Sequence, residues 1–462
     1  MRTETDSMGS MQVPRDVLYG AQTARAVENF PVSGWRIPPR MIAAIGQVKL
    51  ACATVNRDRG AIDGAVAAAI IAAAREVADN QLDDQFPVDV FQTGSGTSSN
   101  MNANEVIASR ARKILGGGKA ATEAIHPNDQ VNMAQSSNDV IPTAIQVAAA
   151  LAILDTVIPA LEHLAGRLEG KVEAFDQVVK IARTHLMDAV PIRLGQEFSG
   201  FAAQVRNSIP ALRAAAERLS KLPIGGTAVG TGLNAPEGFG RKVAEALSEQ
   251  TGGQFSETDN HFAAQAARDE MLQASAAMRG AAIAIGKIAS DIRLLGSGPR
   301  CGIGELKLPA LQPGSSIMPG KVNPVICESG IQVACQIVGF DAAIAAGVTG
   351  GVGSILELNV AMPMIAWNLL VGLDLLASVS RLLADKCIEG LEPDAQRCSE
   401  FIEQSLAMCT ALAPEIGYDA AAELAKEAYA TGQTIRQIIT EKGLIENDRL
   451  SVLLDPRKQT GN

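Results

Sequence analysis

Apolar residues recur at steps of three and four positions along several long stretches of the chain. Val147, Leu151, Leu154, Ile158 and Leu161 form one such series, and this spacing places apolar side chains on one face of a helix. Similar series or long apolar segments cover about 198–212, 262–296, 324–346 and 369–383. The pattern predicts five helices longer than the usual mean of about 11–12 residues. We expect them to form a bundle that also packs against other subunits.

The segments on either side of these helices have shorter patterns. Residues 1–40 are polar and interrupted by prolines, which predicts an irregular arm. Periodic stretches at about 41–58, 62–80 and 100–115 predict shorter helices, and small helices separated by glycines follow residue 388. We therefore predict an N-terminal mostly helical domain over 1–139, a long-helix bundle over 140–388 and a small C-terminal helical domain over 389–462.

Composition narrows the class of protein. Hydrophobic residues make up 47% of the chain but aromatic residues only 3%, which favours closely packed helices over a sandwich or barrel. The net charge of −10 argues against nucleic acid or an anionic membrane as the main partner. The N-terminus lacks an apolar signal region, and the uncharged runs fall short of the roughly 20 residues that span a bilayer. We expect a soluble, cytoplasmic protein.

The seven cysteines include no CxxC pair, and their number is odd. This usage is typical of a reducing compartment. Cys387, Cys398 and Cys409 recur every eleven residues, which would place them near one helical face. We interpret these three as core packing, because metal ligands normally have closer spacing.

The segment 314–324 is polar, begins with glycine and carries one lysine, Lys321, between two predicted long helices. It is not a nucleotide-phosphate loop, because five residues separate Gly314 from Gly320 and Val322 stands where Ser or Thr is required. Asn323 followed by proline predicts a helix start with Asn323 as N-cap. A helix N-terminus beside a lysine is suited to holding an anion.

Three further loops, about 93–98, 126–139 and 183–188, are rich in hydroxyl, amide and histidine side chains. Each loop alone is also compatible with an ordinary structural role. Long helices separate the loops, so they would meet only at bundle ends or between subunits. No zinc, iron or EF-hand ligand pattern appears in the sequence. The side chains suit abstraction of a proton beside a carboxylate, with His185 oriented by Glu328 as a hypothesis.

The run from Gly314 to Pro324 resembles, without a gap, the signature of the fumarase/aspartase superfamily. The similarity extends from about Asp6 to Pro456. Aspartases typically carry Gln where this chain has His185. They also usually carry Thr in place of Ser137 and an Ala-bearing loop in place of 93–97. At these positions, and over 226–234, the chain is similar to class II fumarases.

This resemblance implies a mainly α, three-domain fold with a central bundle of five long helices. Four copies would form a homotetramer with a twenty-helix core, and its active sites would be shared between subunits. The implied reaction is the reversible, stereospecific hydration of fumarate to L-malate in the tricarboxylic acid cycle. It would need no metal and no cofactor, and the partner would be a small dicarboxylate.

The resemblance also implies three sets of residues. Ser315 would be the base beside the malate carboxylate, on a mobile loop, and His185 with Glu328 would handle the water. The catalytic set is Ser315, His185, Glu328 and Lys321. The substrate-binding set is Ser95, Gly96, Thr97, Ser136, Ser137, Asn138, Thr184, Ser316, Val322 and Asn323. The secondary anion site is His126, Pro127, Asn128 and Asp129.

Three positions depart from the family pattern: Glu123 replaces a basic residue of certain relatives, Gln130 replaces a common Asp, and Phe340 replaces an Asn. Glu123 puts the secondary anion site in doubt. Two alternatives stay open at this point, aspartate ammonia-lyase or another fumarate-forming lyase, and an inactive helical scaffold. A scaffold would have no need of the four predicted catalytic residues together.

Overall fold

The structure, a computed structural model, describes residues 1–461 and is mainly helical, as predicted. Helix accounts for 63% of it, and the strands of the described residues pair only in two-stranded sheets. The chain forms two compact units, each built from three segments. Unit 1 comprises Met1–Pro159, Ile209–Ala282 and Cys335–Ala377, and unit 2 comprises Ala160–Ser208, Ile283–Ala334 and the residues from Ser378 onward. The three domain boundaries drawn from the sequence stay a prediction.

The five long helical stretches are confirmed. They are α6 (Ser137–Ala152), η3 (Ile153–Val157) and α7 (Ile158–Ala174) in succession; α8 (Leu194–Leu219); α11 (Asp269–Leu295); α12 (Val325–Val348); and α13 (Met362–Leu383) continued by η4 (Ala384–Ile388). Val147, Ile158 and Leu161 are buried, whereas Leu151 and Leu154 are only half-buried. Leu154 lies within the π turn η3, whose wider turn shifts the apolar face of the helix.

One predicted helix is interrupted. The segment expected over 262–296 consists of α10 (His261–Ala266) and α11, separated at Ala267, where the backbone is extended. Arg268 is fully buried, and its guanidinium donates hydrogen bonds to the carbonyls of Ala264 and Gln265 at 2.6 and 2.5 Å. These bonds satisfy carbonyls that would otherwise be left free where α10 ends.

The irregular arm predicted for residues 1–40 is wrong for much of its length. Strand β1 (Arg2–Asp6) pairs antiparallel with β2 (Gly9–Val13), and helix α1 (Ala21–Asn29) follows. The two strands contain mostly polar residues, so their two-residue alternation produced no apolar signal. Arg25 joins α1 to the hairpin through an ion pair with Asp6 at 2.7 Å.

Unit 1 contains the shorter helices predicted from the sequence, within a few residues of their expected ends. The elements are α2 (Pro39–Asp58), α3 (Gly64–Ala78), η1 (Asp83–Gln85), α4 (Thr97–Ile114), α5 (Gly118–Ala124), η2 (Pro127–Val131), β5 (Lys221–Leu222), α9 (Phe239–Thr251), β6 (Ser256–Glu257), β8 (Ser354–Ile355) and β9 (Leu358–Asn359). The core is lined largely by alanine, valine and isoleucine, which lets the helices approach closely.

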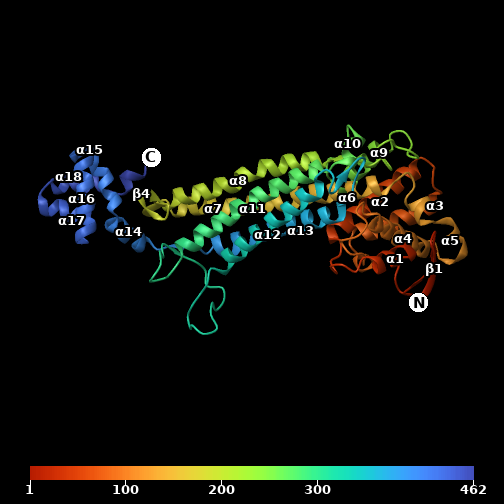
Figure 1. Cartoon of the computed structure of the whole chain (residues 1–462), viewed down its shortest axis with the longest axis horizontal. Coiled ribbons are helices and arrows are strands. Elements are labelled where there is room, and N and C mark those ends of the chain that lie inside the picture. Colours follow the sequence, from red (N-terminus) through yellow and green to blue (C-terminus); the bar gives the residue numbers. More distant parts are fainter. Residues whose placement is uncertain (462) are drawn as a thin grey trace. The chain divides into compact units, whose positions relative to one another are not determined.

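Unit 2 contains the hairpin of β3 (Val179–Thr184) and β4 (Met187–Arg193) and a cluster of small helices near the C-terminus (Figure 1). The remaining elements are β7 (Leu306–Lys307), β10 (Glu392–Pro393), α14 (Ala395–Gln404), η5 (Leu406–Leu412), α15 (Ala413–Ile416), α16 (Tyr418–Thr431), α17 (Ile435–Lys442), α18 (Asn447–Leu453) and η6 (Arg457–Thr460). Leu412, Ile438 and Ile439 are among the residues that form the core of this cluster.

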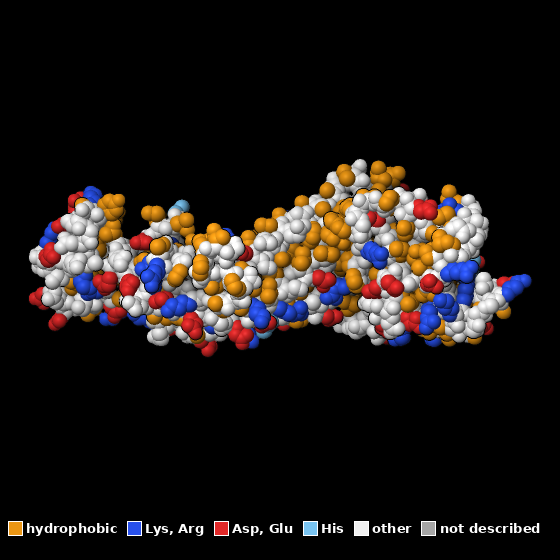
Figure 2. All heavy atoms as spheres, turned by 90° about the horizontal axis from the view of Figure 1, so that it is seen from below, with side chains coloured by type: hydrophobic (Ala, Val, Ile, Leu, Met, Phe, Trp, Pro, Cys, Tyr) orange, Lys and Arg blue, Asp and Glu red, His pale blue; other side chains and the backbone are white. Residues whose placement is uncertain are grey.

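By length and composition, three helical stretches are apolar enough to cross a membrane: Ser137–Ala174, Val325–Val348 and Met362–Ile388. In the first and third, 72% and 67% of the apolar window is buried inside the chain, but in α12 only 33% is buried. Hydrophobic side chains are also visible at the surface among the charged ones (Figure 2). Within a single chain, α12 therefore leaves much of its apolar surface uncovered.

Candidate active site

The N-termini of helices α4 and α6 lie side by side in unit 1. Gly96, the N-cap of α4, has φ of 72°, and a side chain there would approach Ile141 of α6 to 2.8 Å. Asn100 donates from Nδ2 to the Ser137 hydroxyl at 3.1 Å, which joins the two first turns. Helix N-termini carry unpaired N–H groups and partial positive charge. The pair therefore forms a preformed place for an anionic group.

Uncharged hydrogen-bonding groups surround these helix ends. The hydroxyls of Ser95 and Thr97 lie 2.8 Å apart, and Ser136 forms a capping box with Asp139 at the start of α6. Asn138 donates from Nδ2 to the Ala228 carbonyl at 2.8 Å. The structure thus brings six of the predicted substrate-binding residues into one region of unit 1: Ser95, Gly96, Thr97, Ser136, Ser137 and Asn138.

The loop before α4 has no space for a side chain at Gly94. A Cβ there would lie 1.7 Å from the carbonyl oxygen of Val360, and the Gly94 carbonyl accepts a hydrogen bond from the N–H of Met362. The start of α13 therefore fixes the position of the 93–97 loop, and the loop in turn positions Ser95 and Thr97.

A buried polar network that the sequence reasoning missed lies behind the helix ends. Lys49 of α2 is fully buried and donates from Nζ to Asn132 Oδ1 at 2.8 Å and to Gln135 Oε1 at 2.9 Å. Asn100 and Asn104 donate to the same Asn132 oxygen, each at 3.2 Å. The only available signal was a single lysine inside the apolar helix predicted over 41–58.

Asp139 links the start of α6 to the loop over 225–227. Its carboxylate accepts backbone N–H bonds from Ser136 at 2.9 Å, Gly225 at 3.1 Å and Thr227 at 3.0 Å. Burial raises the pKa of Asp139 to about 6, although the three backbone bonds and Lys49 oppose this shift. Burial likewise lowers the pKa of Lys49 to about 7. Both groups therefore titrate close to neutral pH.

The segment 314–324 of unit 2, called the lysine loop below, is closed by its own hydrogen bonds. The Gly314 N–H donates to the Lys321 carbonyl at 2.7 Å, and Asn323 donates from Nδ2 to the Gly314 carbonyl at 2.7 Å. Lys321 donates from Nζ to Asn323 Oδ1 at 2.7 Å. The Ser315 hydroxyl accepts the N–H bonds of Ile317 and Met318 at 3.2 and 3.0 Å, so it is held inside the loop turn.

The predicted N-cap role of Asn323 is wrong. Helix α12 begins at Val325, and the Pro324 carbonyl accepts the N–H bond of Glu328 at 3.1 Å, which places Pro324 at the N-cap. The amide of Asn323 is unavailable as a cap because it closes the lysine loop. Ser316, Lys321 and Val322 are exposed on this loop.

His185 lies at the tip of the β3–β4 hairpin, directly after Thr184. His185 and Leu186 have φ of 56° and 63°, the left-handed conformation that a two-residue hairpin loop requires and that Asn-Gly usually supplies. Strand β3 is held by Lys180 near its start and by Arg183 near the tip, which pair with the buried Glu305 at 3.2 and 3.0 Å. The tip itself is exposed, with Leu186 74% accessible.

The predicted pairing of His185 with Glu328 stays a prediction. No hydrogen bond or ion pair joins these two side chains, or either of them to Ser315, in the part of the chain that the structure describes. Glu328 is half-buried in the first turn of α12. Likewise, within residues 1–461 no group of three or more His, Cys, Asp or Glu side chains is arranged to hold a metal ion.

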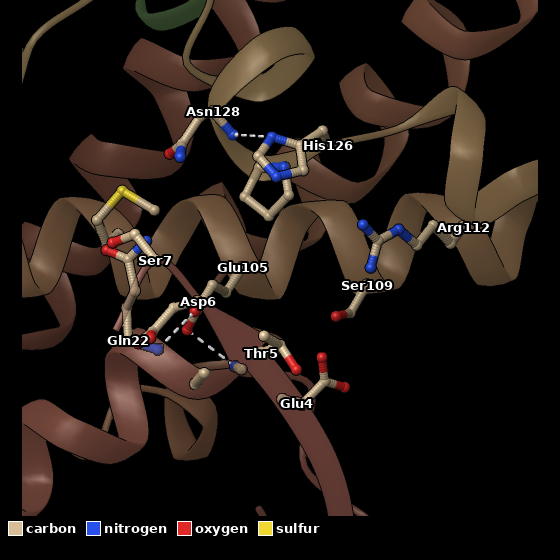
Figure 3. Close-up of a pocket in the computed structure, with 14 residues that line it drawn as sticks. Glu4, Thr5, Asp6, Ser7, Gln22, Glu105, Ser109, Arg112, His126 and Asn128 are labelled. Atoms are coloured by element: carbon tan, nitrogen blue, oxygen red, sulfur yellow. Dashed lines mark hydrogen bonds between the residues drawn. The ribbon is translucent and has the colours of Figure 1, made fainter. Parts of the chain in front are cut away.

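A pocket of about 360 Å³ lies beside His126 in unit 1 (Figure 3). Glu105 and Arg112 of α4 line it, together with Asn128 from the His126 loop and Glu4 from β1. His126 accepts the N–H bond of Asn128 at its Nδ1 atom, at 3.3 Å. The pocket therefore has basic and acidic groups on its walls.

The acidic groups of this pocket already have partners. The Glu105 carboxylate accepts N–H bonds from Gly20, Gln22 and Thr23 at 2.8 to 3.1 Å, where it caps the start of α1. Glu123, whose charge departs from the family pattern, does not line the pocket and lies 3.6 Å from Lys119.

Comparison with known proteins assigns the chain to a family. A family profile described as lyase matches residues 9–339, and one described as fumarase C C-terminus matches residues 408–461. A relative named fumarate hydratase class II, from Halobacterium salinarum, is 53% identical over 99% of this chain and 97% of its own. This chain belongs to the class II fumarase family. It is therefore an enzyme of the hydro-lyase class.

Further relatives of this fumarase agree over nearly the whole length. The fumarate hydratase class II of Thermosynechococcus vestitus is 50% identical over 96% of this chain and 94% of its own. The crystal structure of a class II fumarase from Schistosoma mansoni matches with a TM-score of 0.95 and 38% identity, covering 99% of this chain and 98% of that one. A fumarate lyase:delta crystallin from Brucella melitensis, bound to cobalt, matches with a TM-score of 0.94 and 43% identity, covering 100% of both chains.

The buried lysine predicts a pH dependence of stability. The pKa of Lys49 is about 7 in the folded protein, whereas 10.5 is its ordinary value. Between pH 7 and pH 10.5, Lys49 is therefore protonated in the unfolded chain but deprotonated in the folded protein. The free energy of unfolding should therefore rise with pH from about 7.5 to 9, by about 1 kcal/mol per pH unit from this group. In Lys49→Met this contribution should vanish.

Denaturant unfolding at several pH values, at one protein concentration, measures this slope. Lys119→Met, which removes an exposed lysine, is the matched control and should keep the wild-type slope. Equal slopes in wild type and Lys49→Met would show that Lys49 stays charged in the folded protein.

Proposed function

We propose that this class II fumarase catalyses the reversible, stereospecific hydration of fumarate to L-malate in the tricarboxylic acid cycle. The observation that carries the proposal is the pair of helix N-termini, α4 and α6, surrounded by hydroxyl and amide groups. Such groups bind a carboxylate without adding a competing charge. Ser95, Thr97, Ser137 and Asn138 are the proposed ligands of one substrate carboxylate.

In the direction from malate to fumarate, Ser315 is the proposed base. It removes the proton from the carbon beside one carboxylate, and the electron pair moves into that carboxylate group. Lys321, Asn323 and the helix ends stabilise the negative charge that develops on its oxygens. His185 then gives a proton to the hydroxyl group on the neighbouring carbon, and the C–O bond breaks to release water while the electron pair returns from the carboxylate group to form the C=C double bond. Hydration follows the same steps in reverse.

Glu328 has a supporting role in this proposal: it would orient the His185 imidazole and set the tautomer that exchanges protons with water. Thr184, Ser136, Ser316, Gly96 and Val322 complete the proposed substrate-binding set. No metal ion or cofactor has a step in this mechanism. Metal independence is part of the proposal, and the first experiment below tests it.

We further propose a homotetramer in which each active site draws on more than one subunit. Two features of the single chain support this. The α12 helix keeps only 33% of its apolar window buried, and the His185 hairpin ends in the exposed apolar residues Leu186 and Met187. A partner subunit would cover both, and a twenty-helix core would result. A cytoplasmic location, without nucleic-acid or membrane partners, completes the proposal.

The pocket beside His126 is the proposed secondary anion site, with His126, Pro127, Asn128 and Asp129. His126 is half-exposed and lies 3.5 Å from the Asp129 carboxylate, which itself does not line the pocket. The pocket is lined by β1, later turns of α4 and the His126 loop, and not by Ser95, Thr97 or Ser137 at the helix ends. We therefore expect it to bind an anion without taking part in turnover.

The first prediction concerns the reaction. Purified protein with EDTA should produce fumarate from L-malate, measured as the ultraviolet absorbance of the new double bond, and should produce none from L-aspartate. Product from aspartate alone would instead identify an ammonia-lyase. Absence of product from both substrates would remove the proposed function and favour another lyase or a scaffold.

The second prediction concerns the base. Ser315→Ala should reduce kcat by about 10²-fold or more, because a positioned proton acceptor contributes roughly that factor, while the oligomer stays intact by size-exclusion chromatography. Ser451→Ala, which removes an exposed hydroxyl from α18, is the control and should keep full activity. Near-normal turnover of Ser315→Ala would rule out Ser315 as the base.

The third prediction separates the two histidines. His126→Ala should keep most of the fumarase activity, whereas His185→Ala should lose it. The measurement is kcat and KM for L-malate in both variants. A collapse of kcat in His126→Ala alone would mean that the catalytic and secondary sites are assigned the wrong way round.

A further inference from the structure

Two buried thiols of unit 2 face each other, and neither belongs to the proposed catalytic or substrate-binding residues. The Sγ atoms of Cys327 and Cys387 lie 3.8 Å apart, and the residues are 0% and 2% exposed. Cys327 belongs to the first turn of α12, and Cys387 belongs to the π turn η4 that ends the α13 helix. Both thiols are free. The pair lies within reach of a disulfide bond of about 2.05 Å after a small movement.

A narrow cleft leads to both thiols. Its lining includes both cysteines, together with Leu308, Pro309, Pro324 and Lys386. The free space inside is enough for about one water-sized molecule. This space matches only an oxidant close to water in size, such as hydrogen peroxide, and is too small for a tripeptide thiol or a bulky alkylating reagent.

The two thiols differ in acidity. The two sulfurs share one hydrogen bond, in which either atom can be the donor. This bond lowers the pKa of Cys327, with a further contribution from Arg293. The same bond raises the pKa of Cys387, and burial raises it further. Cys327 is therefore the sulfur that reacts first as a thiolate, and Cys387 is the sulfur that keeps its proton.

The other buried cysteines of the described chain serve as a comparison. Burial raises the pKa of Cys52 well above its usual range and that of Cys398 to about 12, and neither has a hydrogen bond to another sulfur among residues 1–461. They behave as small apolar side chains of the core. The interpretation as core packing therefore suits Cys398 but is incomplete for Cys387.

We propose that Cys327 and Cys387 form a dithiol site that hydrogen peroxide converts into a reversible disulfide. The Cys327 thiolate attacks one peroxide oxygen, the O–O bond breaks, and the released hydroxide takes up a proton to become water. Cys327 is then a sulfenic acid. The Cys387 sulfur attacks it, the S–O bond breaks, the proton of Cys387 leaves with the hydroxyl group as a second water, and the S–S bond forms.

This disulfide would act on the segment that carries the proposed catalytic groups. Cys327 directly precedes Glu328, and the lysine loop that holds Ser315 ends just before α12. Shortening the distance between the sulfurs from 3.8 Å to about 2.05 Å draws the first turn of α12 toward η4. Oxidation should therefore lower turnover, and a reducing agent should restore it. This functional consequence rests on the proposed fumarase activity, whereas the formation of the disulfide does not.

The first test is peptide mapping of the full-length protein. Reduced protein is treated with hydrogen peroxide, remaining thiols are alkylated after denaturation, and the digest is analysed by mass spectrometry. We expect a linked peptide pair that joins Cys327 to Cys387, has lost two hydrogens, and separates on reduction. The Cys398→Ser variant should give the same pair. Absence of this pair, while the exposed Cys301 and Cys335 are oxidised, would overturn the proposal.

Single variants test the order of the steps. In Cys387→Ser the reaction should stop at the sulfenic acid of Cys327, which a cyclic 1,3-diketone labels after mild treatment. In Cys327→Ser the remaining Cys387 should stay a free thiol under the same conditions. Equal labelling of the remaining cysteine in both variants would overturn the assignment of Cys327 as the reacting thiolate.

Turnover of L-malate is the separate readout. Peroxide should lower kcat of the wild type several-fold, with recovery on reduction, and should leave Cys327→Ser unaffected. If the linked pair forms while kcat stays unchanged, the coupling to the catalytic segment is wrong. If the untreated protein has no activity on malate, the proposed function fails, and the peptide map still decides whether the dithiol site exists.

Discussion

The buried carboxylate of Asp139 holds together the region where substrate is proposed to bind. It satisfies N–H groups at the start of α6 and in the loop over 225–227, so two segments distant in sequence share one acceptor. A buried acceptor of this kind is costly to leave without donors. The position of the start of α6 against this loop therefore depends on a group that is not itself proposed to touch substrate.

The same region also indicates how a protein with a negative net charge can accommodate a dianionic substrate. The chain carries a net charge of −10, yet the side chains around the two helix ends are mostly neutral hydroxyls and amides. Asp139 faces inward, and the Lys49 network lies behind it. Short-range dipoles and donors then act on the substrate, while the distant acidic groups are screened by solvent and salt.

Much of the fold could be predicted from the sequence, because the long helices repeat their apolar signal over many turns. The β1–β2 hairpin gave no such signal, since its residues are nearly all polar. The break at Ala267 depends on the buried guanidinium of Arg268, and the role of Lys49 depends on amide partners over 80 positions away. These features arise from tertiary contacts, which no local pattern in the sequence reports.

The loops of the candidate site could be predicted from the sequence, but the contacts between them could not. The loops that bear Ser95, Ser137, His185 and Ser315 stood out by their composition, and six of the predicted binding residues lie together in unit 1. The pairing of His185 with Glu328 depends on the relative placement of separate segments, and the proposed sharing between subunits adds a second copy of the chain. Neither can be deduced from one sequence.

The left-handed turn at His185 and Leu186 has a consequence for assembly. Two residues with side chains hold a conformation that costs each of them roughly 1 kcal/mol or more, and the ion pairs of Glu305 with Lys180 and Arg183 anchor the strand directly before it. The anchored strand therefore limits the conformations that are open to the tip. A partner subunit would meet a hairpin that is already restrained on one strand, so less of the entropy lost on docking would come from this hairpin.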